Sequence, residues 1–304
     1  MIKKLLLLSL ICSSTIAMAQ ETDLFDLLDE DASGSTVGAS KVVYATFKGT
    51  QLINAATNET PGKGVLQYVI AHRFGSFGDE YLYNFLGLDN AQIRMQTDYG
   101  ITDRLNIGAG RSSFLKVADG FIKYQLLQQQ TGARNIPFST TLHSSLHYRN
   151  AKYSDGVEHF TSDRLSFMHQ AIIARKWNRQ LSTLISPSIV HFNLVPTSND
   201  PNTTAHLTLG GRYKFTNRIA LTAETTLMSN NSYDAVQNVS SETRHTVPMA
   251  VGVDVETGGH VFQFHLSNTH SMNAPYWMAQ NPYDIRNGGL FLGFNISRVF
   301  TIRE

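Results

Sequence analysis

The sequence predicts an all-β protein, an antiparallel up-and-down transmembrane β-barrel of about twelve strands. Three observations support this fold class: strand-length segments alternate between apolar and polar residues, short turns alternate with long loops, and the chain begins with an apolar export signal. The alternation is clearest over residues 90–99, where Ile93 and Met95 fall on one face and Arg94 and Asp98 on the other. One apolar and one polar face are typical of a wall between lipid and a polar interior.

The N-terminus predicts export. Two lysines and an apolar run occupy residues 3–11, and the small residues at 17–19 resemble a cleavage sequence, so residues 1–19 are expected to be a secretory signal peptide. This run is too short to span a membrane, and no later stretch reaches eighteen apolar residues, so helical spans are excluded. The lone cysteine, Cys12, lies inside the signal, so the mature chain is expected to have no disulfide and no cysteine metal site.

The remaining chain predicts one domain. Residues 20–40 are acidic and then Gly/Ser-rich, which predicts a periplasmic leader, and residues 41–304 form the predicted outer-membrane barrel domain. A net charge of +1 with 16% charged residues gives no basic patch for nucleic acid. The slightly negative mean hydropathy of −0.17 is compatible with a barrel, because only alternate residues of each strand meet lipid.

Strand patterns recur along the whole domain, and their number can be counted. They cover residues 41–50, 65–74, 90–99, 104–113, 119–128, 138–148, 164–177, 180–192, 204–215, 218–228, 247–257, 260–269 and 288–300. Bacterial barrels have even strand numbers, with short turns on the periplasmic side, so counting back from the last strand begins the wall at residues 65–74. Segment 41–50 is then surplus, and we predict that it lies in the lumen or pairs only at the periplasmic rim.

The polar faces of these strands predict a charged lumen. The inward positions with charged or imidazole side chains are Arg94, Asp98, Arg104, His206, Arg212, Lys214, Glu224, Asp254 and Glu256. These residues brace the interior by pairing with one another, or they form a selectivity lining for a small solute, and we favour the first interpretation. If segment 41–50 enters the lumen, Lys41 and Lys48 are expected to meet the lumen carboxylates.

One motif suggests an enzyme as a competing hypothesis. His265-Leu266-Ser267-Asn268 is similar to the H-x-S-N pattern of outer-membrane phospholipases and lipid A deacylases, in which a histidine activates a serine for acyl transfer. In those enzymes the pair faces lipid, whereas here Leu266 takes the outward position and His265 and Ser267 point inward. Thr269 also replaces the glycine expected after the motif. We therefore expect no catalytic residue.

Neither the histidines nor the loop aromatics predict a ligand site. His143 and His147 share a face, but four strand residues separate them by about 13 Å, too far for one metal ion. No cofactor and no metal are therefore expected. In the long loop 270–287, Tyr276, Trp277 and Tyr283 are expected to anchor the barrel at the lipid headgroups; the alternative for this aromatic cluster is to hold a ligand such as a sugar.

Five segments carry a resemblance to a known family. They are ATFKGT at 45–50, IAHRFG at 70–75, YGITDRLNIG at 99–108, GRSS at 110–113 and KYQLLQ at 123–128. Together they resemble a family of uncharacterised outer-membrane β-barrel proteins of Bacteroidota, a domain of unknown function, over most of the chain from about residue 41. The resemblance implies a barrel in the outer membrane of a Gram-negative cell and supplies no catalytic residue, cofactor or substrate. At the C-terminus, Phe300 is not terminal, which departs from the usual barrel pattern.

These observations predict an outer-membrane barrel with a structural or narrow-channel role and no catalysis. The expected partners are outer-membrane lipid, the barrel-assembly machinery and, for a channel, a small solute; nucleic acid is not expected. Two alternatives remain: an outer-membrane lipid hydrolase that uses His265 and Ser267, and a soluble periplasmic β-sandwich that binds a ligand.

Overall fold

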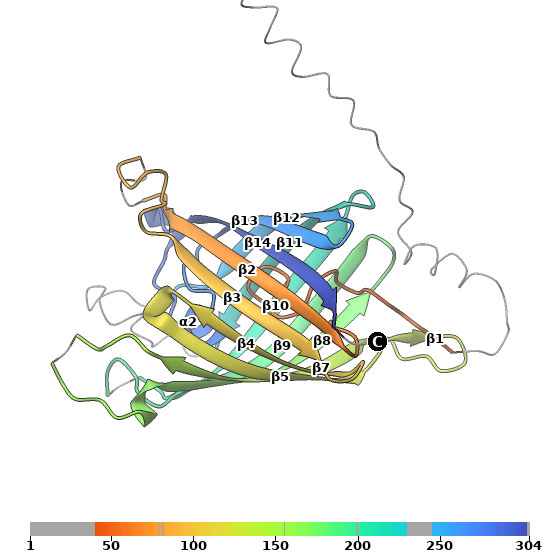
Figure 1. The fold of residues 1–304 in the computed structure, drawn as a ribbon, viewed down its shortest axis with the longest axis horizontal. Helices are drawn as coiled ribbons and strands as arrows, with labels where there is room; N and C mark the ends of the chain where they lie inside the picture. Colours follow the sequence, from red (N-terminus) through yellow and green to blue (C-terminus); the bar gives the residue numbers. More distant parts are fainter. Residues whose placement is uncertain are drawn as a thin grey trace, which may run out of the picture. The chain divides into compact units, whose positions relative to one another are not determined.

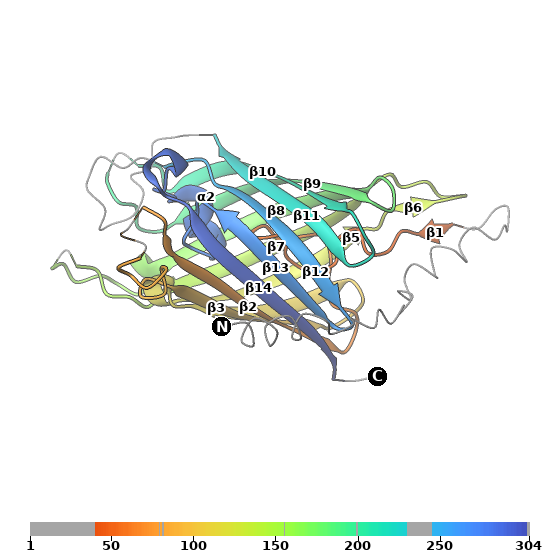
Figure 2. The ribbon, with the colours of Figure 1, turned by 90° about the horizontal axis from the view of Figure 1, so that it is seen from above.

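Twelve antiparallel strands form a closed barrel in which each strand pairs with its neighbours in sequence and the first strand pairs with the last (Figures 1 and 2). The strands are β2 (Val65–Ser76), β3 (Gln92–Gly100), β4 (Leu105–Ser112), β5 (Val117–Leu127), β7 (Ser139–Arg149), β8 (Leu165–Lys176), β9 (Leu181–Phe192), β10 (Thr203–Lys214), β11 (Ile219–Met228), β12 (Met249–Thr257), β13 (His260–Ser267) and β14 (Phe291–Thr301). The predicted fold class and strand number are confirmed. The soluble β-sandwich alternative is wrong, because the sheet closes on itself.

The computed structural model describes residues 40–78, 80, 82–154, 156–198, 200–229 and 245–302. The predicted signal peptide, residues 1–19, and leader residues 20–39 lie outside this range, and both stay predictions. Three 3₁₀ helices, η1 (Phe114–Lys116), η2 (Ser162–Arg164) and η3 (Ile285–Asn287), and one short α-helix, α2 (Ala274–Ala279), lie in connections between strands. No helix of the described chain is long and apolar enough to cross a membrane.

Segment 41–50 takes no place in the wall. Only two of its residues are extended, in β1 (Lys41–Val42), which pairs with β6 (Gln130–Thr131) in the connection between β5 and β7. Lys41 therefore lies opposite Thr131 in this small sheet, away from the lumen carboxylates that it was expected to meet. The rest of the segment enters the barrel.

The short turns are built by side-chain oxygens. Thr102, Asn178 and Thr216 occupy equivalent positions in the turns between β3 and β4, β8 and β9, and β10 and β11. In each turn the side-chain oxygen accepts the backbone N–H groups of the residues two and three positions later, at 2.8–3.2 Å. Such bonds stabilise tight turns without glycine. They also place Arg104 in an exposed turn, just before the first residue of β4.

The two faces of the wall follow the alternation in the sequence. On β12, Val251 is 55% exposed and points outward, whereas Ala250 and Asp254 are buried and point inward. The same alternation repeats in the other wall strands, with exposed Ile, Leu, Val, Met and Phe side chains outside and buried polar side chains inside. The outer face therefore suits hydrocarbon and the inner face does not.

Placing a charge on the outer face tests this assignment. We expect Val251→Arg to reduce the free energy of unfolding by about 2–4 kcal/mol if the residue lies near the bilayer midplane. Val251→Leu, which keeps the apolar character, serves as the matched control. Denaturant unfolding in lipid vesicles measures both changes, and equal stability of the two variants would contradict the outward assignment.

The inward faces of β8 and β9 are an exception to the polar interior. Met168 and Ile172 of β8 and Leu184 and Val190 of β9 are buried inside the barrel, although their strands also carry apolar residues outside. A strand that is apolar on both faces is covered on both faces. The apolar stripe therefore requires that other parts of the chain pack inside the barrel.

Candidate functional site

The segment that fills the lumen from the short-turn end is residues 43–62, called the plug below; it is the orange-red trace inside the barrel in Figures 1 and 2. Its centre is a tight hairpin in which Gln51 bridges to Ala56. The hairpin is closed by the bond from Leu52 N–H to the Ala55 carbonyl at 2.8 Å and by the bond from Thr57 N–H to the Thr50 carbonyl at 3.0 Å. This self-contained hairpin presents its tip to the barrel wall.

The tip of the hairpin is held by one carboxylate. The backbone N–H groups of Ile53, Asn54 and Ala55 donate to the Glu224 carboxylate of β11 at 3.1, 2.8 and 3.1 Å. Three successive N–H groups form a cradle for an anion, and hydrogen bonds to a charged acceptor are stronger than those between neutral groups. Glu224 was predicted as a lumen residue, and the structure places it at the anchor of the plug.

A second set of bonds fixes the hairpin to β2 and β14. Arg73 of β2 donates to the Asn54 side chain at 2.8 Å and to the Asn295 side chain of β14 at 3.2 Å. Asn295 in turn donates to the Ile53 carbonyl at 2.9 Å. The tip is therefore bonded to both sides of the seam at which β2 meets β14.

The apolar side of the plug packs on the apolar stripe of the wall. Phe47 and Leu52 form one buried cluster with Ile172 and Leu184. Gly210 of β10 makes room for this contact, because a Cβ at that position would lie only 2.7 Å from Leu52 Cδ2. The plug thus satisfies the inward apolar residues that a water-filled lumen would leave exposed.

A charge cluster lies beside the plug near its entrance. Arg212 of β10 donates to Asp254 at 3.3 Å and also pairs with Glu256, both on β12. Lys48 of the plug lies 3.1 Å from the second oxygen of Glu256. The pairing of Lys48 with a lumen carboxylate is confirmed, and Lys48 balances the charge of the three predicted lumen residues, Arg212, Asp254 and Glu256.

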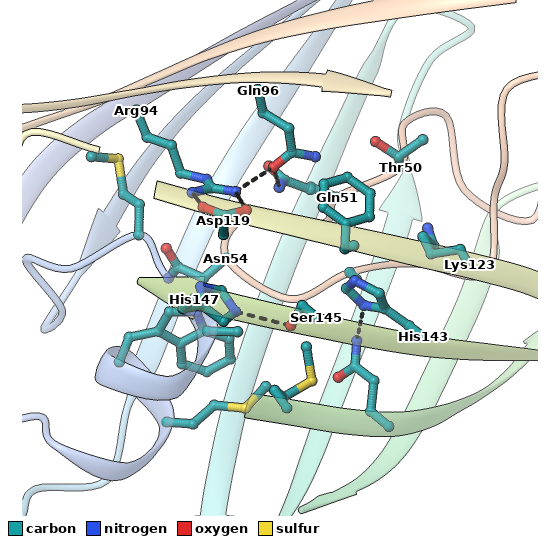
Figure 3. Close-up of a pocket in the computed structure, with 18 of the residues that line it drawn as sticks. Thr50, Gln51, Asn54, Arg94, Gln96, Asp119, Lys123, His143, Ser145 and His147 are labelled. Atoms are coloured by element: carbon teal, nitrogen blue, oxygen red, sulfur yellow. Dashed lines mark hydrogen bonds and ion pairs between the residues drawn. The ribbon is translucent and has the colours of Figure 1, made fainter. Parts of the chain in front are cut away.

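A second polar network spans the middle of the lumen (Figure 3). Arg94 of β3 pairs with both oxygens of Asp119 on β5 and donates to the Gln96 side chain at 3.0 Å. Gln96 donates to Asp98 at 3.1 Å, and the Thr50 hydroxyl of the plug donates to Asp98 at 2.9 Å. Each ionised group in this low-dielectric interior therefore has a hydrogen-bond partner.

The barrel is closed from the long-loop end by residues 268–290, called the cap below. Its helix α2 lies inside the barrel mouth (Figure 2), where Trp277 is 2% exposed and packs in one cluster with Met168 and Val190. The Asn273 side chain, just before α2, donates to Asp119 at 3.0 Å and so joins the cap to the central network. Burial lowers the pKa of His270 in the cap to about 4, so this imidazole is neutral at neutral pH.

The expectation that Tyr276 and Trp277 anchor the barrel at the headgroups is wrong, because both side chains are buried inside it. The physical reason is the apolar stripe: the inward faces of β8 and β9 offer these aromatics a dry surface within the barrel. Trp177 is the residue at an interfacial position. It is exposed in the turn after β8, its ring lies 4.0 Å from the Arg175 guanidinium, and its Nε1–H donates to Thr183 at 2.8 Å.

The positions of the two tryptophans of the chain therefore predict opposite quenching of their fluorescence by brominated lipids. In vesicles of lipids brominated near the headgroup, we expect Trp177 to be quenched, because it faces the membrane, and Trp277 to be shielded by the barrel. Trp177→Phe should abolish the quenching, and Trp277→Phe should leave it intact. Quenching that depends on Trp277 would contradict the position of α2.

A cavity remains between the plug and the cap. It offers about 50 Å³ to the centres of water molecules, which is room for roughly three to five waters. Its lining combines polar and charged side chains with a substantial apolar surface and comprises Thr50, Gln51, Asn54, Ala56, Arg94, Gln96, Asp98, Asp119, Phe121, Lys123, His143, Ser145, His147, Met168, Gln170, Met272, Ala274, Trp277 and Met278. Figure 3 shows His143, His147 and Lys123 on one side of it and Gln96 on the other.

The histidines of this cavity each have one ring nitrogen without a protein partner. His143 Nδ1 bonds to Gln170 at 2.8 Å and His147 Nε2 bonds to Ser145 at 2.9 Å, while His143 Nε2 and His147 Nδ1 are buried and have no hydrogen-bond partner in the described chain. Buried polar atoms of this kind pair with water or with a bound molecule. Lys123, also on the lining, donates to the Glu59 carbonyl of the plug at 2.7 Å.

The structure separates the predicted lumen residues into three groups. Those buried in the lumen are Arg94, Asp98, His206, Arg212, Glu224, Asp254 and Glu256. Lys214 is half-buried at the end of β10, and Arg104 is exposed in its turn. Sequence reasoning missed Arg73, Asp119 and Lys123, although their inward parity within β2 and β5 was a usable signal.

The residues of the hydrolase alternative point inward. His265 and Ser267 are buried, and the Ser267 hydroxyl hydrogen-bonds to the Thr269 hydroxyl at 2.8 Å. A serine and a histidine do meet on the outer wall, where Ser144 lies 2.8 Å from His169 Nδ1. Both are near the middle of their strands, whereas lipid ester groups lie about 15 Å from the bilayer midplane. Neither pair is placed to attack a lipid ester.

The described residues contain no group of three or more His, Cys, Asp or Glu side chains that could hold a metal ion. The charged groups of the lumen instead form ion pairs, as between Arg212 and Asp254, or bond to the plug, as Glu224 does.

Comparison with known proteins gives one family. The profile of a family described as a membrane bound beta barrel domain (DUF5777) matches residues 47–300. The match begins within the plug and ends in the last wall strand. No match was found among curated proteins.

Two solved structures illustrate the similarity to other barrels. OmpF of Salmonella typhi, in complex with daunomycin, has 8% identity and a TM-score of 0.37, covering 78% of this chain and 97% of that chain. The outer membrane channel DcaP of Acinetobacter baumannii has 8% identity and a TM-score of 0.32, covering 77% and 72%. With TM-scores below 0.5, what those proteins do says nothing about this chain.

Proposed function

Because the chain belongs to this family of membrane-bound β-barrel domains, we propose that it is an outer-membrane protein whose barrel is a narrow, plugged channel without catalytic activity. The observation that carries the proposal is the polar lumen interrupted by two inserted segments, the plug and the cap. Eight strands give an interior that side chains alone can fill, so this twelve-stranded barrel is closed because further segments of the chain occupy its lumen.

The size and lining of the cavity favour a small polar solute as the molecule that passes through the channel. The lining provides two imidazole nitrogens, His143 Nε2 and His147 Nδ1, that have no hydrogen-bond partner among the described residues. The charges nearby are compensated, because Arg94 pairs with Asp119. A neutral or zwitterionic solute of a few heavy atoms therefore suits this interior better than a large or highly charged one.

The origin and route of the protein belong to the same proposal. Residues 1–19 direct export, the barrel-assembly machinery inserts the wall, and the cell is a Gram-negative bacterium of the Bacteroidota. The support for this is the N-terminal sequence pattern and the resemblance of the five segments named above. The remaining partners are the lipids around the outer wall.

Fractionation and conductance test the proposal together. The protein should stay in the outer-membrane fraction after extraction with salt and alkali, and it should migrate differently on gels before and after boiling. In planar bilayers the intact protein should show a closed level with rare small openings. Recovery as a soluble periplasmic protein would refute the location, and a steady large conductance would refute the closed lumen.

A further inference from the structure

The described residues of the loop between β2 and β3, which are 77, 78, 80 and 82–91, expose an unusual number of large apolar side chains. Leu82, Tyr83 and Phe85 are 81%, 83% and 66% exposed, more than Val251 on the outer wall. Phe77, Leu86 and Leu88 are exposed as well. So many exposed large apolar side chains in one loop indicate an interaction site, because water solvates them poorly.

Backbone hydrogen bonds hold the loop in this conformation. Asn84 N–H donates to the Glu80 carbonyl at 3.0 Å, and Leu88 N–H donates to the Phe85 carbonyl at 3.2 Å. Gly75 N–H at the end of β2 donates to the Gly87 carbonyl at 2.7 Å and closes the base. The apolar side chains are therefore directed outward by a folded loop.

A second contact fixes the base of the loop to the connection between β13 and β14. Phe77 N–H donates to the Leu290 carbonyl and Gly78 N–H to the Gly288 carbonyl, both at 3.0 Å. Gly78 permits this approach, because a Cβ there would lie 2.9 Å from the Asn287 carbonyl oxygen. The loop thus stands at a fixed place on the rim, beside the seam of β2 and β14.

The position of the loop points to lipid as the surface that covers it. It continues β2, whose outward side chains include His72 and Phe74, packed with Phe294 of β14 on the outer wall. In Figure 1 the loop rises from the end of β2, at one end of the barrel. It therefore follows closely, along the chain, the outward aromatic side chain of Phe74.

The composition of the loop favours contact with lipid acyl chains over binding to charged headgroups. Residues 77–91 contain three acidic residues and no Lys or Arg, so attraction to anionic headgroups cannot hold them at the membrane. Apolar side chains of this kind are stabilised by insertion at the boundary between headgroups and acyl chains.

We propose that the loop of residues 77–91 is a membrane anchor that inserts Leu82, Tyr83 and Phe85 into the adjacent lipid leaflet. This inference rests on the proposed membrane location of the barrel. It assigns the loop to lipid and not to a second copy of the chain. The anchor fixes the tilt and depth of the barrel on the side of the seam, where β2 and β14 meet.

Single-tryptophan reporters test the anchor. In a Trp177→Phe, Trp277→Phe background, Tyr83→Trp places the reporter in the loop, and Leu82→Trp gives a second position. Lys152→Trp, an exposed position in the connection between β7 and β8, is the matched loop control, and Val251→Trp is the wall control. Each variant is measured in phosphatidylcholine vesicles with bromines at shallow or deep acyl positions, and with aqueous iodide.

The anchor predicts that both loop reporters lose most of their fluorescence to shallow bromines and resist iodide, while Lys152→Trp behaves oppositely. Loop reporters that iodide quenches as readily as Lys152→Trp would overturn it. Shielding from iodide without quenching by bromines, together with a cross-linked dimer, would overturn it in favour of a second copy. If Val251→Trp also escapes the bromines, the proposed membrane location fails; if only the loop reporters escape, the anchor alone fails.

Discussion

Deleting residues 43–62 is expected to convert the closed barrel into one with a measurable steady conductance in planar bilayers. The deletion removes the hairpin that fills the short-turn half of the lumen and leaves an entrance lined by Arg212, Asp254 and Glu256. The cap still narrows the other end, so the deletion of residues 273–280 in addition should raise the conductance further. Gel migration before and after boiling establishes that the barrel has formed.

The deletion also exposes the apolar stripe on β8 and β9, and this has a cost. Phe47 and Leu52 are buried there, and losing a buried Phe or Leu side chain typically costs about 2–5 kcal/mol. We therefore expect a folded but less stable barrel. Unchanged conductance in a folded deletion variant would contradict the role of the plug as the barrier, since the lumen would then be closed by the cap alone.

Glu224→Ala is expected to release the plug without shortening the chain. The substitution leaves the N–H groups of Ile53, Asn54 and Ala55 buried without an acceptor, and each such group costs about 1–3 kcal/mol. The loss of stabilisation is therefore about 3 kcal/mol or more. Denaturant unfolding measures the loss, and the frequency of channel openings reports the release of the hairpin.

Two control variants separate anchoring from general destabilisation. Glu224→Gln keeps an acceptor oxygen at the same place and should lose less stability than Glu224→Ala, with few additional openings. Thr222→Ala changes a buried residue on the same face of β11 whose hydroxyl has no hydrogen-bond partner among the described residues, and it should leave the openings unchanged. Equal behaviour of all three variants would show that the plug does not depend on the carboxylate.

The wall could be predicted from the sequence because its rule is local. A period of two fixes which face a residue takes, so Arg94, Asp98 and Glu224 were assigned to the lumen without knowledge of their partners. Arg104 shows that the alternation of faces applies only within a strand. It keeps the inward parity of β4, but the bonds to Thr102 turn the chain before the strand begins, and parity has no meaning in a turn.

The contents of the barrel could not be predicted in the same way. Residues 51–59 and α2 are neither periodic nor long, and their positions depend on partners far away in the sequence, such as Glu224 for Asn54. The assignment of Trp277 to the membrane interface followed from where barrel aromatics usually lie. The overlooked signal was in β8 and β9, whose apolar residues on both faces required a partner inside the barrel.

The anchorage of the plug across the seam has a consequence for the order of assembly. Its hairpin is the first part of the described chain after β1, yet Ile53 bonds to Asn295, 242 residues later, on the last wall strand. The part of the binding surface that Arg73 and Asn295 form across the seam therefore does not exist until β14 pairs with β2. Contacts this distant in sequence slow folding far more than they reduce final stability. We expect the forming sheet to close around the plug. The pairing of β14 with β2 and the closing of the lumen by the plug should then occur in the same kinetic step.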